Sequence, residues 1–156
     1  YKIENITLYR INIFNGYDYS FRNSPIDVEG ITVEKGVEEL LNRPTGTEVV
    51  YITQDQDFFN KTGTDTVIAA TEFSRILGTN DYGVFKLNVK NVFTTDSGKK
   101  DAVTCADVNS TAAVIYIKEG ENKIYKEGEC LVLQGTSSDI IKVGDRFAYY
   151  LAGVVV

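Results

Sequence analysis

The sequence predicts a mainly β domain: an antiparallel β-sandwich of the immunoglobulin-like or jelly-roll-like kind, with one or two short helices. Short segments rich in β-branched and aromatic residues follow one another at the spacing typical of sandwiches, and strands do not alternate with long helices. The chain has 156 residues, of which 43% are hydrophobic. This is enough for one core and too little for two. We therefore expect residues 1–156 to form a single β-sandwich domain.

The first third of the chain contains three predicted elements. Residues 3–14 alternate between two faces, which is typical of a half-buried strand, and residues 31–33 form a second, short strand. Apolar residues between positions 37 and 41 lie at one-turn helical spacing and are stopped by Pro44. We expect a short helix or a turn there.

The middle of the chain mixes strand and helix signals. Residues 48–53 are β-branched and aromatic, as in a strand, and the polar run 54–66 predicts a long loop. Apolar residues in 69–77 recur at helical spacing, with Asp65 placed as N-cap and Gly78 past the end, although residues 66–68 could equally begin a strand. Residues 85–93 alternate as an amphipathic strand whose charged face should meet water.

The only two cysteines, Cys105 and Cys130, bracket the two runs that most favour a β-hairpin. Residues 112–117 are apolar, residues 119–122 have turn chemistry, and residues 123–126 lead on to a further strand that starts at Cys130. We expect a Cys105–Cys130 disulfide in the centre of the domain. Two buried free thiols are the alternative.

The C-terminal part is predicted to finish the sheet. Residues 140–143 form a short strand after a turn, and residues 146–156 are apolar on both faces and rich in β-formers. A run of this kind is typical of a central strand.

Composition excludes several classes of function. A net charge of -6 repels nucleic acid and anionic lipid, and no apolar run is long enough to span a membrane. The chain has no histidine, which removes the usual general base and the commonest metal ligand. No phosphate-binding glycine motif occurs, and two cysteines cannot form a structural zinc site. We expect a non-catalytic domain without a bound cofactor.

Other features favour an extracellular, cell-surface setting. The chain starts at Tyr1 in a predicted strand and contains no methionine, so we expect that an N-terminal segment was removed by processing or by excision of the domain. Three sequons make Asn5, Asn60 and Asn109 candidates for glycosylation. A chain rich in Asn and Thr also produces one or two such triplets by chance. With the predicted disulfide, the sequons favour an oxidising compartment.

Two groups of residues are candidate binding sites. Oxygen-bearing side chains in the predicted loop, at Asp55, Asp57, Asn60 and Asp65, resemble a Ca²⁺-binding set, although their spacing differs from that of an EF-hand. A solvated acidic loop is the alternative.

Tyrosines form the second group, at Tyr9, Tyr17, Tyr19, Tyr149 and Tyr150. Exposed tyrosines build sugar-binding platforms and protein interfaces. Core packing is the alternative, and their positions in predicted strands favour it.

Short motifs resemble the outer domain of archaeal surface-filament subunits, the archaellins and related type IV pilin-like proteins. Residues 3–9 and the Ser-Pro-Ile-Asp turn at 24–27 look like the family's first strand and turn, and residues 141–148 are similar to its later Gly-Asp turn. The family's N-terminal hydrophobic helix and its last strands have no counterpart here. Another extracellular filament or surface-layer protein therefore stays an alternative.

The resemblance implies a structural subunit that associates with itself into a filament or coat. Together with the missing catalytic groups, it predicts a non-catalytic, extracellular structural protein. The alternative is a carbohydrate- or cell-surface-binding module, an adhesin that uses exposed tyrosines and the acidic loop, with Ca²⁺ as its candidate ion.

Overall fold

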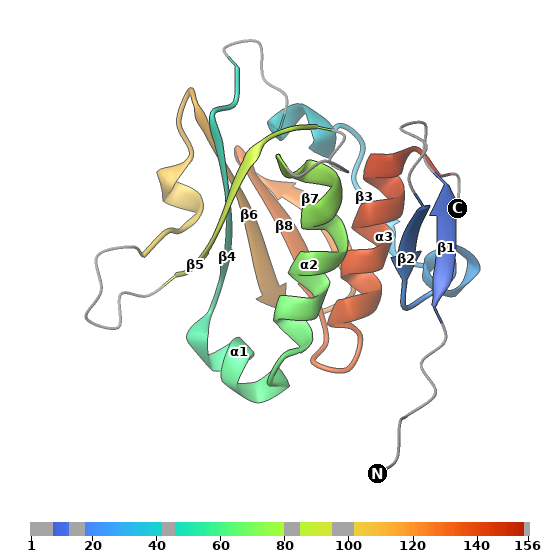
Figure 1. The fold of residues 1–156 in the computed structure, drawn as a ribbon. Helices are drawn as coiled ribbons and strands as arrows, with labels where there is room; N and C mark the ends of the chain where they lie inside the picture. Colours follow the sequence, from blue (N-terminus) through green and yellow to red (C-terminus); the bar gives the residue numbers. More distant parts are fainter. Residues whose placement is uncertain (1–7, 13–17, 42–45, 80–84, 95–101, 155–156) are drawn as a thin grey trace.

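A computed structural model describes residues 8–12, 18–41, 46–79, 85–94 and 102–154. Its main body is a six-stranded sheet in the order β3-β7-β8-β6-β4-β5, with helices on one face (Figure 1). The strands are β1 Tyr9–Asn12, β2 Asp18–Phe21, β3 Thr32–Val33, β4 Val49–Gln54, β5 Asn88–Phe93, β6 Ala112–Glu119, β7 Lys123–Glu127 and β8 Cys130–Gly135. The helices are α1 Gln56–Thr62, α2 Asp65–Leu77 and α3 Ile140–Ala152, with 3₁₀ turns η1 Ile26–Val28, η2 Val37–Leu40 and η3 Cys105–Asp107.

The predicted antiparallel β-sandwich is wrong. β4 runs parallel to both β5 and β6, β6 runs parallel to β8, and β3 runs parallel to β7, so β7–β8 is the antiparallel pair of this sheet. The architecture is therefore α/β, with a mixed, mostly parallel sheet. The physical reason for the error is burial: β8 is buried at every position. A strand covered on both faces has no alternation to distinguish it from other apolar runs.

The C-terminal strands predicted at residues 140–143 and 146–156 are also wrong, because this segment forms α3. Its buried side chains include four that recur at helical spacing on one face: Ile140, Val143, Phe147 and Leu151. Gly153 ends the helix with a φ of 76°, and its backbone N–H donates to the carbonyl groups of Tyr149 and Tyr150. A glycine in the left-handed region is a common helix terminator.

The long loop predicted for residues 54–66 contains α1 and the start of α2 instead. The two helices are separated by a short turn at Gly63, whose φ is 66°. The helix predicted for residues 69–77 is confirmed and extends back to Asp65, with Gly78 at its C-cap. The short helix predicted near residues 37–41 is confirmed as η2.

The predicted hairpin between residues 112–117 and 123–126 is wrong, although both runs are strands. β8 lies between β6 and β7: it pairs parallel with β6 and antiparallel with β7. The hairpin is therefore formed by β7 and β8. The predicted Cys105–Cys130 disulfide is confirmed, with a Cα–Cα distance of 5.3 Å.

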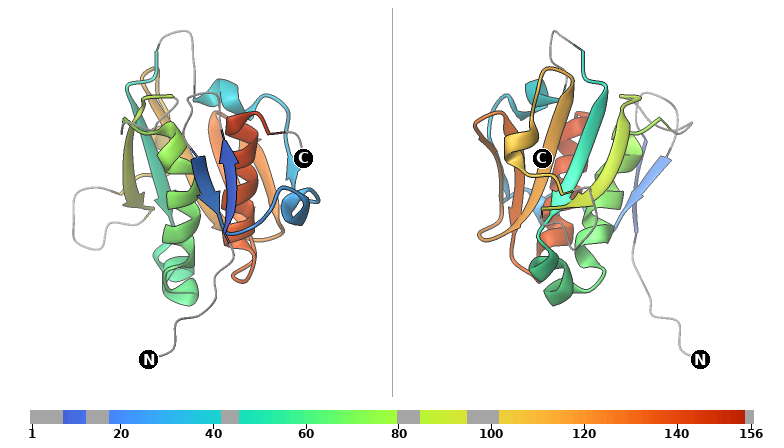
Figure 2. Two further views of the ribbon diagram at one scale, coloured as in Figure 1. Left: turned by 45° about the vertical axis from the view of Figure 1, so that its right-hand side comes forward. Right: turned by 90° about the vertical axis from the view of Figure 1, so that its left-hand side faces the viewer.

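Three other predicted strands are confirmed, at residues 31–33, 48–53 and, in its second half, 85–93. Of the strand predicted for residues 3–14, β1 is described, and residues 1–7 and 13–14 lie outside the described residues. β1 and β2 pair as a separate antiparallel hairpin on the outer side of α2 and α3 (Figure 2). Tyr19 and Phe21 are fully buried there, and the Phe21 ring meets the Tyr149 ring edge-on at 4.7 Å.

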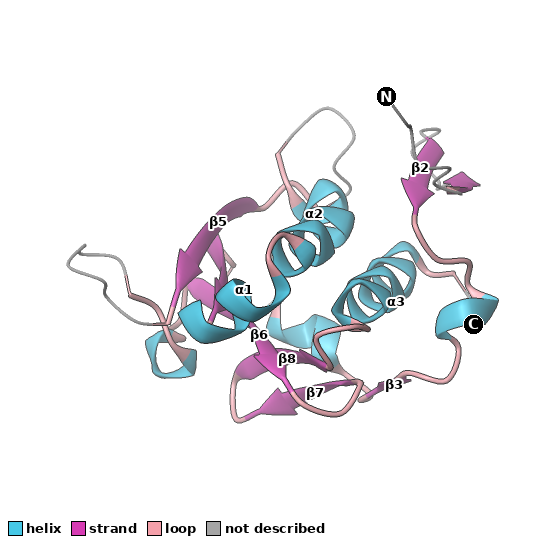
Figure 3. Cartoon of the chain, turned by 90° about the horizontal axis from the view of Figure 1, so that it is seen from below, coloured by secondary structure: helices cyan, strands magenta, loops and turns pink. Residues whose placement is uncertain are grey.

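The sheet thus has two different faces. α2 and α3 cover one face, as the view along the sheet shows (Figure 3). Residues 102–111, which we call the crossing segment, connect β5 to β6 and pack on the other face. Val103 and Cys130 are buried in a small cluster there with Val114. The Thr53 hydroxyl donates to the Val103 carbonyl at 2.7 Å, and the Val103 N–H donates to the Phe93 carbonyl at 2.9 Å.

Close approach of α2 and α3 depends on Gly144. A Cβ atom at this position would lie 2.7 Å from the backbone oxygen of Ala69 and 2.9 Å from its Cα. Because these are backbone contacts, the helices must separate to admit a side chain. We expect Gly144→Ala to lower the free energy of unfolding by roughly 1–3 kcal/mol, measured by urea denaturation. Gly30→Ala is the control, since nothing lies within 4 Å of its Cβ position. Equal stabilities of the two variants would contradict this account.

Candidate functional site

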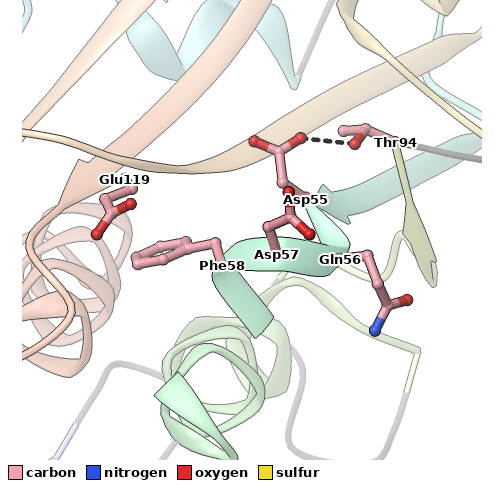
Figure 4. A pocket seen from close by; sticks show the side chains of 6 residues that line it. All are labelled: Asp55, Gln56, Asp57, Phe58, Thr94 and Glu119. Carbon is pink, nitrogen blue, oxygen red and sulfur yellow. Dashed lines mark hydrogen bonds between the residues drawn. The ribbon is translucent and has the colours of Figure 1, made fainter. Parts of the chain in front are cut away.

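A pocket of about 240 Å³ lies where the carboxyl ends of the central parallel strands meet. Asp55 directly follows β4, Thr94 directly follows β5, and Glu119 is the last residue of β6. β5 lies on one side of β4 and β6 on the other. In open α/β sheets, ligands bind outside the carboxyl ends of the strands, between neighbouring strands whose connections lead to opposite faces of the sheet. The pocket is lined by Asp55, Gln56, Asp57, Phe58, Thr94 and Glu119 (Figure 4).

The Asp55 carboxylate is held in one orientation by two hydroxyl groups. Thr94 Oγ1 donates to Oδ1 at 2.6 Å, and the Tyr116 hydroxyl donates to Oδ2 at 2.6 Å. Burial, and then the hydrogen bond and negative charge of Asp55, raise the pKa of Tyr116. The Tyr116 hydroxyl therefore keeps its proton and remains a donor. Each carboxylate oxygen retains a lone pair for another donor, because an ionised carboxyl group accepts about four hydrogen bonds.

The other polar groups of the pocket are mostly acidic. Figure 4 shows Glu119 on one side and Asp55 with Asp57 on the other, with the Phe58 ring between them. Phe58 is 3% exposed and closes this part of the pocket. Lys61 forms an ion pair with Glu119. Three carboxylates against one ammonium group leave the pocket negative.

The carboxylates of the pocket are suited to accept hydrogen bonds from a ligand. Ionised carboxylates accept and cannot donate, so a ligand must bring hydroxyl, amide or ammonium donors. Phosphate and carboxylate ligands would meet repulsion from Asp55 and Asp57. The described lining residues hold no thiol or imidazole that could serve as a nucleophile or general base near neutral pH.

The four residues of the predicted Ca²⁺ set do not come together as one site. Asp55 lies in the pocket and Asp57 lines it in the first turn of α1. Asn60 accepts a hydrogen bond from Gln56 along α1, and Asp65 opens α2. Within the part of the chain that the structure describes, no three Asp, Glu, Cys or His side chains are grouped to hold a metal ion. The two helices separate residues that the sequence alone placed in one loop.

The described tyrosines of this group pack wholly or partly in the core, which is the interpretation that their positions in predicted strands favoured. Tyr19 and Tyr149 are fully buried, and the Tyr149 hydroxyl donates to the Asn23 carbonyl at 2.5 Å. Tyr9 and Tyr150 are half-buried, and the Tyr150 hydroxyl donates to Glu38. Tyr17 lies outside the described residues.

Two of the three candidate glycosylation residues are exposed. Asn60 lies on the surface of α1, and Asn109 lies in the crossing segment, where its side-chain oxygen accepts from the N–H groups of Thr111 and Ala112 at 2.9 Å. Asn5 lies outside the described residues. Glycosylation at these positions stays a prediction. Separately, no described helix combines the length and apolar character needed to cross a lipid bilayer.

Sequence reasoning missed Thr94, Tyr116 and Glu119, which complete the pocket around Asp55. The signal for Thr94 and Glu119 was their place at the ends of apolar runs. In a parallel sheet such ends meet at one edge, whereas in an antiparallel sandwich consecutive ends point in opposite directions. The error in fold class therefore caused the error in the site.

A second acidic group, also missed, is buried between α2, α3 and the loop after β2. Asp145 is fully buried, and Glu72 is 7% exposed. The backbone N–H and the side-chain amide of Asn23 donate to Asp145 Oδ2 at 2.9 and 2.8 Å. Arg75 donates to the Ser20 carbonyl at 2.8 Å and lies 3.5 Å from Glu72 Oε2. We call Glu72 and Asp145 the buried acid pair.

The surroundings of the buried acid pair favour one shared proton. Burial, a hydrogen bond with Asp145 and repulsion from its charge raise the pKa of Glu72 to about 8, while Arg75 and Arg22 oppose this rise. Burial also raises the pKa of Asp145. Asp145 Oδ1 has no donor when both carboxyl groups are ionised. A protonated Glu72 supplies that donor, because two neighbouring buried carboxyl groups are stable when they share one proton.

Comparison with protein-family models, with curated proteins and with solved structures finds no match to this chain. The resemblance to archaellins therefore stays a hypothesis.

Proposed function

We propose that this chain is a non-catalytic binding domain of an extracellular protein, and that the Asp55 pocket binds carbohydrate. The observation that carries the proposal is the Asp55 carboxylate, fixed by Thr94 and Tyr116 at the carboxyl edge of the sheet. A neutral sugar presents several hydroxyl donors and no negative charge, which matches fixed carboxylate acceptors in a negative pocket. The Cys105–Cys130 disulfide supports the extracellular setting, since disulfides persist in oxidising compartments.

The test is binding to a glycan array, followed by titration of the best neutral glycan. We expect Asp55→Asn to weaken binding by roughly tenfold to a hundredfold, the loss associated with hydrogen bonds to a charged group. Asp57→Asn should weaken it less, because Asp57 is exposed and has no described hydrogen-bond partner. Glu29→Gln is the control, since Glu29 is exposed and outside the pocket.

Three outcomes would contradict the proposal. One is the absence of any glycan ligand, and another is unchanged affinity in a folded Asp55→Asn variant. Binding of polyamines in preference to glycans would assign the pocket to cationic ligands instead.

A second candidate function is that of a subunit in a surface filament or coat, and the free edge of β5 favours it. β5 is the last strand of the sheet, and among the described residues its outer edge pairs only at Phe93, with Ala102. An unpaired edge is a template for a strand from a neighbouring molecule. Electron microscopy of native cell surfaces, with the chain identified by mass spectrometry, tests this candidate. A dispersed monomer would contradict it.

A further inference from the structure

The β1–β2 hairpin is attached to the rest of the domain through α2 and α3. It forms a two-stranded sheet of its own, separate from the six-stranded sheet, and lies on the outer side of the two helices (Figure 2). An isolated two-stranded hairpin is at best marginally stable in water, so this one depends on its contacts with the helices. Of the elements around the buried acid pair, the hairpin is therefore the one that can open most easily.

The loop after β2 is bound to one member of the buried acid pair. Asn23 donates its backbone N–H and its side-chain amide to Asp145 Oδ2, at 2.9 and 2.8 Å. The Tyr149 hydroxyl donates to the Asn23 carbonyl. Asp145 thus holds the end of the hairpin through Oδ2, while its other oxygen, Oδ1, has no donor unless Glu72 is protonated.

The other member of the pair is linked to β2 through an arginine. Arg75 donates to the Ser20 carbonyl at 2.8 Å and lies 3.5 Å from Glu72 Oε2. Its guanidinium group also lies over the Phe21 ring, 5.3 Å from the ring centre. Ionisation of Glu72 strengthens its attraction for Arg75, in competition with the contacts that Arg75 makes to β2.

The other groups near the pair keep their charge around neutral pH. The titratable and charged groups around Glu72 are Asp145 and Tyr149 of α3, Arg75 of α2 and Arg22 after β2, with Tyr19 beside Arg75 and with Tyr9 and Asp27 near Tyr149. Tyrosine and arginine titrate in the alkaline range, and burial raises the pKa of Tyr149 further. Glu72, whose pKa is raised to about 8, is therefore the group through which pH acts here.

We propose that the buried acid pair is a proton-controlled latch for the β1–β2 hairpin. While the two carboxyl groups share one proton, the hairpin stays on α2 and α3. When both are ionised, their charges repel each other in a buried site, and the hairpin opens to admit water. The two helices stay together, because their backbones are in close contact at Gly144 and Ala69. Opening uncovers the apolar surface on which Tyr19 and Phe21 pack. This inference does not rest on the function proposed for the Asp55 pocket.

Hydrogen exchange of the Asn23 amide in the whole chain measures this opening, because that N–H is bonded to Asp145. After correction for the intrinsic exchange rate, its protection factor should fall about tenfold for each pH unit between about pH 5 and pH 8 and then level off, since opening releases one proton. Amides of β8, which is paired on both sides, should stay more protected than Asn23 at every pH, because the opening is local.

Two variants test whether the acid pair causes this dependence. Glu72→Gln should make the protection of Asn23 independent of pH, because the glutamine amide donates to Asp145 Oδ1 without a titratable proton. Asp145→Asn should do the same, since its amide can donate to an ionised Glu72. Glu129→Gln, at an exposed position, is the control and should keep the natural pH profile.

Three results would overturn the inference. The first is protection of Asn23 that does not vary with pH in the natural protein. The second is a natural pH profile in a folded Glu72→Gln or Asp145→Asn variant. The third is equal protection of Asn23 and β8 at every pH, which would mean that the hairpin opens only when the whole domain unfolds.

Discussion

Replacing Cys105 and Cys130 by alanine is expected to lower the free energy of unfolding by about 3.5 kcal/mol. The disulfide closes a loop of sequence separation 25, and the chain-entropy relation assigns about this value to a loop of that length. The corresponding fall in melting temperature is roughly 7–14 °C for a domain of this size. Alanine is preferred to serine because Cys130 is 1% exposed and a buried hydroxyl without a partner would add its own penalty.

Urea denaturation of the oxidised natural protein and of the double variant measures this effect. Reduction of the natural protein should produce nearly the same loss, which separates the cross-link from the side-chain replacements. The expected result would be refuted by a double variant as stable as the oxidised protein under the same conditions.

The largest pH effect is expected from the buried acid pair. Glu72 has a pKa of about 8 in the folded protein, above its ordinary value of 4.5. When the pKa of a group is higher in the folded protein than in the unfolded protein, protonation of that group stabilises the fold. This stabilisation is complete at a pH below the unfolded pKa and is lost as the pH rises through the folded pKa. The free energy of unfolding should therefore fall by a few kcal/mol between about pH 5 and pH 8. The raised pKa of Asp145 acts in the same direction.

Glu72→Gln should remove this dependence. The glutamine amide can donate to Asp145 Oδ1 at every pH, as the protonated acid does, so the variant should match the natural protein near pH 5 and exceed its stability near pH 8. Urea denaturation at intervals across this range is the measurement. Glu129→Gln, at an exposed position, is the control. A variant less stable than the natural protein at pH 8 would rule out the shared proton.

Local signals were sufficient for several elements. The helical spacing in residues 69–77 and the β-branched run in 48–53 predicted α2 and β4 correctly, because each depends on its own residues. The cysteine pairing was also predictable, since the chain has only two cysteines. These predictions needed no knowledge of which strand lies next to which.

The errors came from runs whose state is set by their neighbours. Residues 146–152 were assigned to a strand because Phe, Tyr and Ala are apolar on several faces, although Ile140, Val143, Phe147 and Leu151 recur at helical spacing. The Phe147 ring packs edge-on against Phe73 of α2. The order of the sheet is likewise not encoded locally, because β6 pairs with β8 and not with β7, although β7 is nearer to β6 in sequence. The pocket could not be predicted for the same reason, because Asp55, Thr94 and Glu119 come together only through the order of the strands. The burial of Glu72 and Asp145 could have been predicted from the sequence, because each acid lies on the apolar face of a helix.

The position of β8 between β6 and β7 affects how the domain can be assembled during synthesis. A nascent chain that ends before Cys130 contains β6 and β7 without the strand that joins them, so β3 and β7 have no link to the rest of the sheet. Its cysteine at position 105 also has no partner. α3, which covers the completed sheet, follows β8 immediately. We therefore expect chains that end before Cys130 to lack the complete sheet, and to form it only after β8 and α3 have been made.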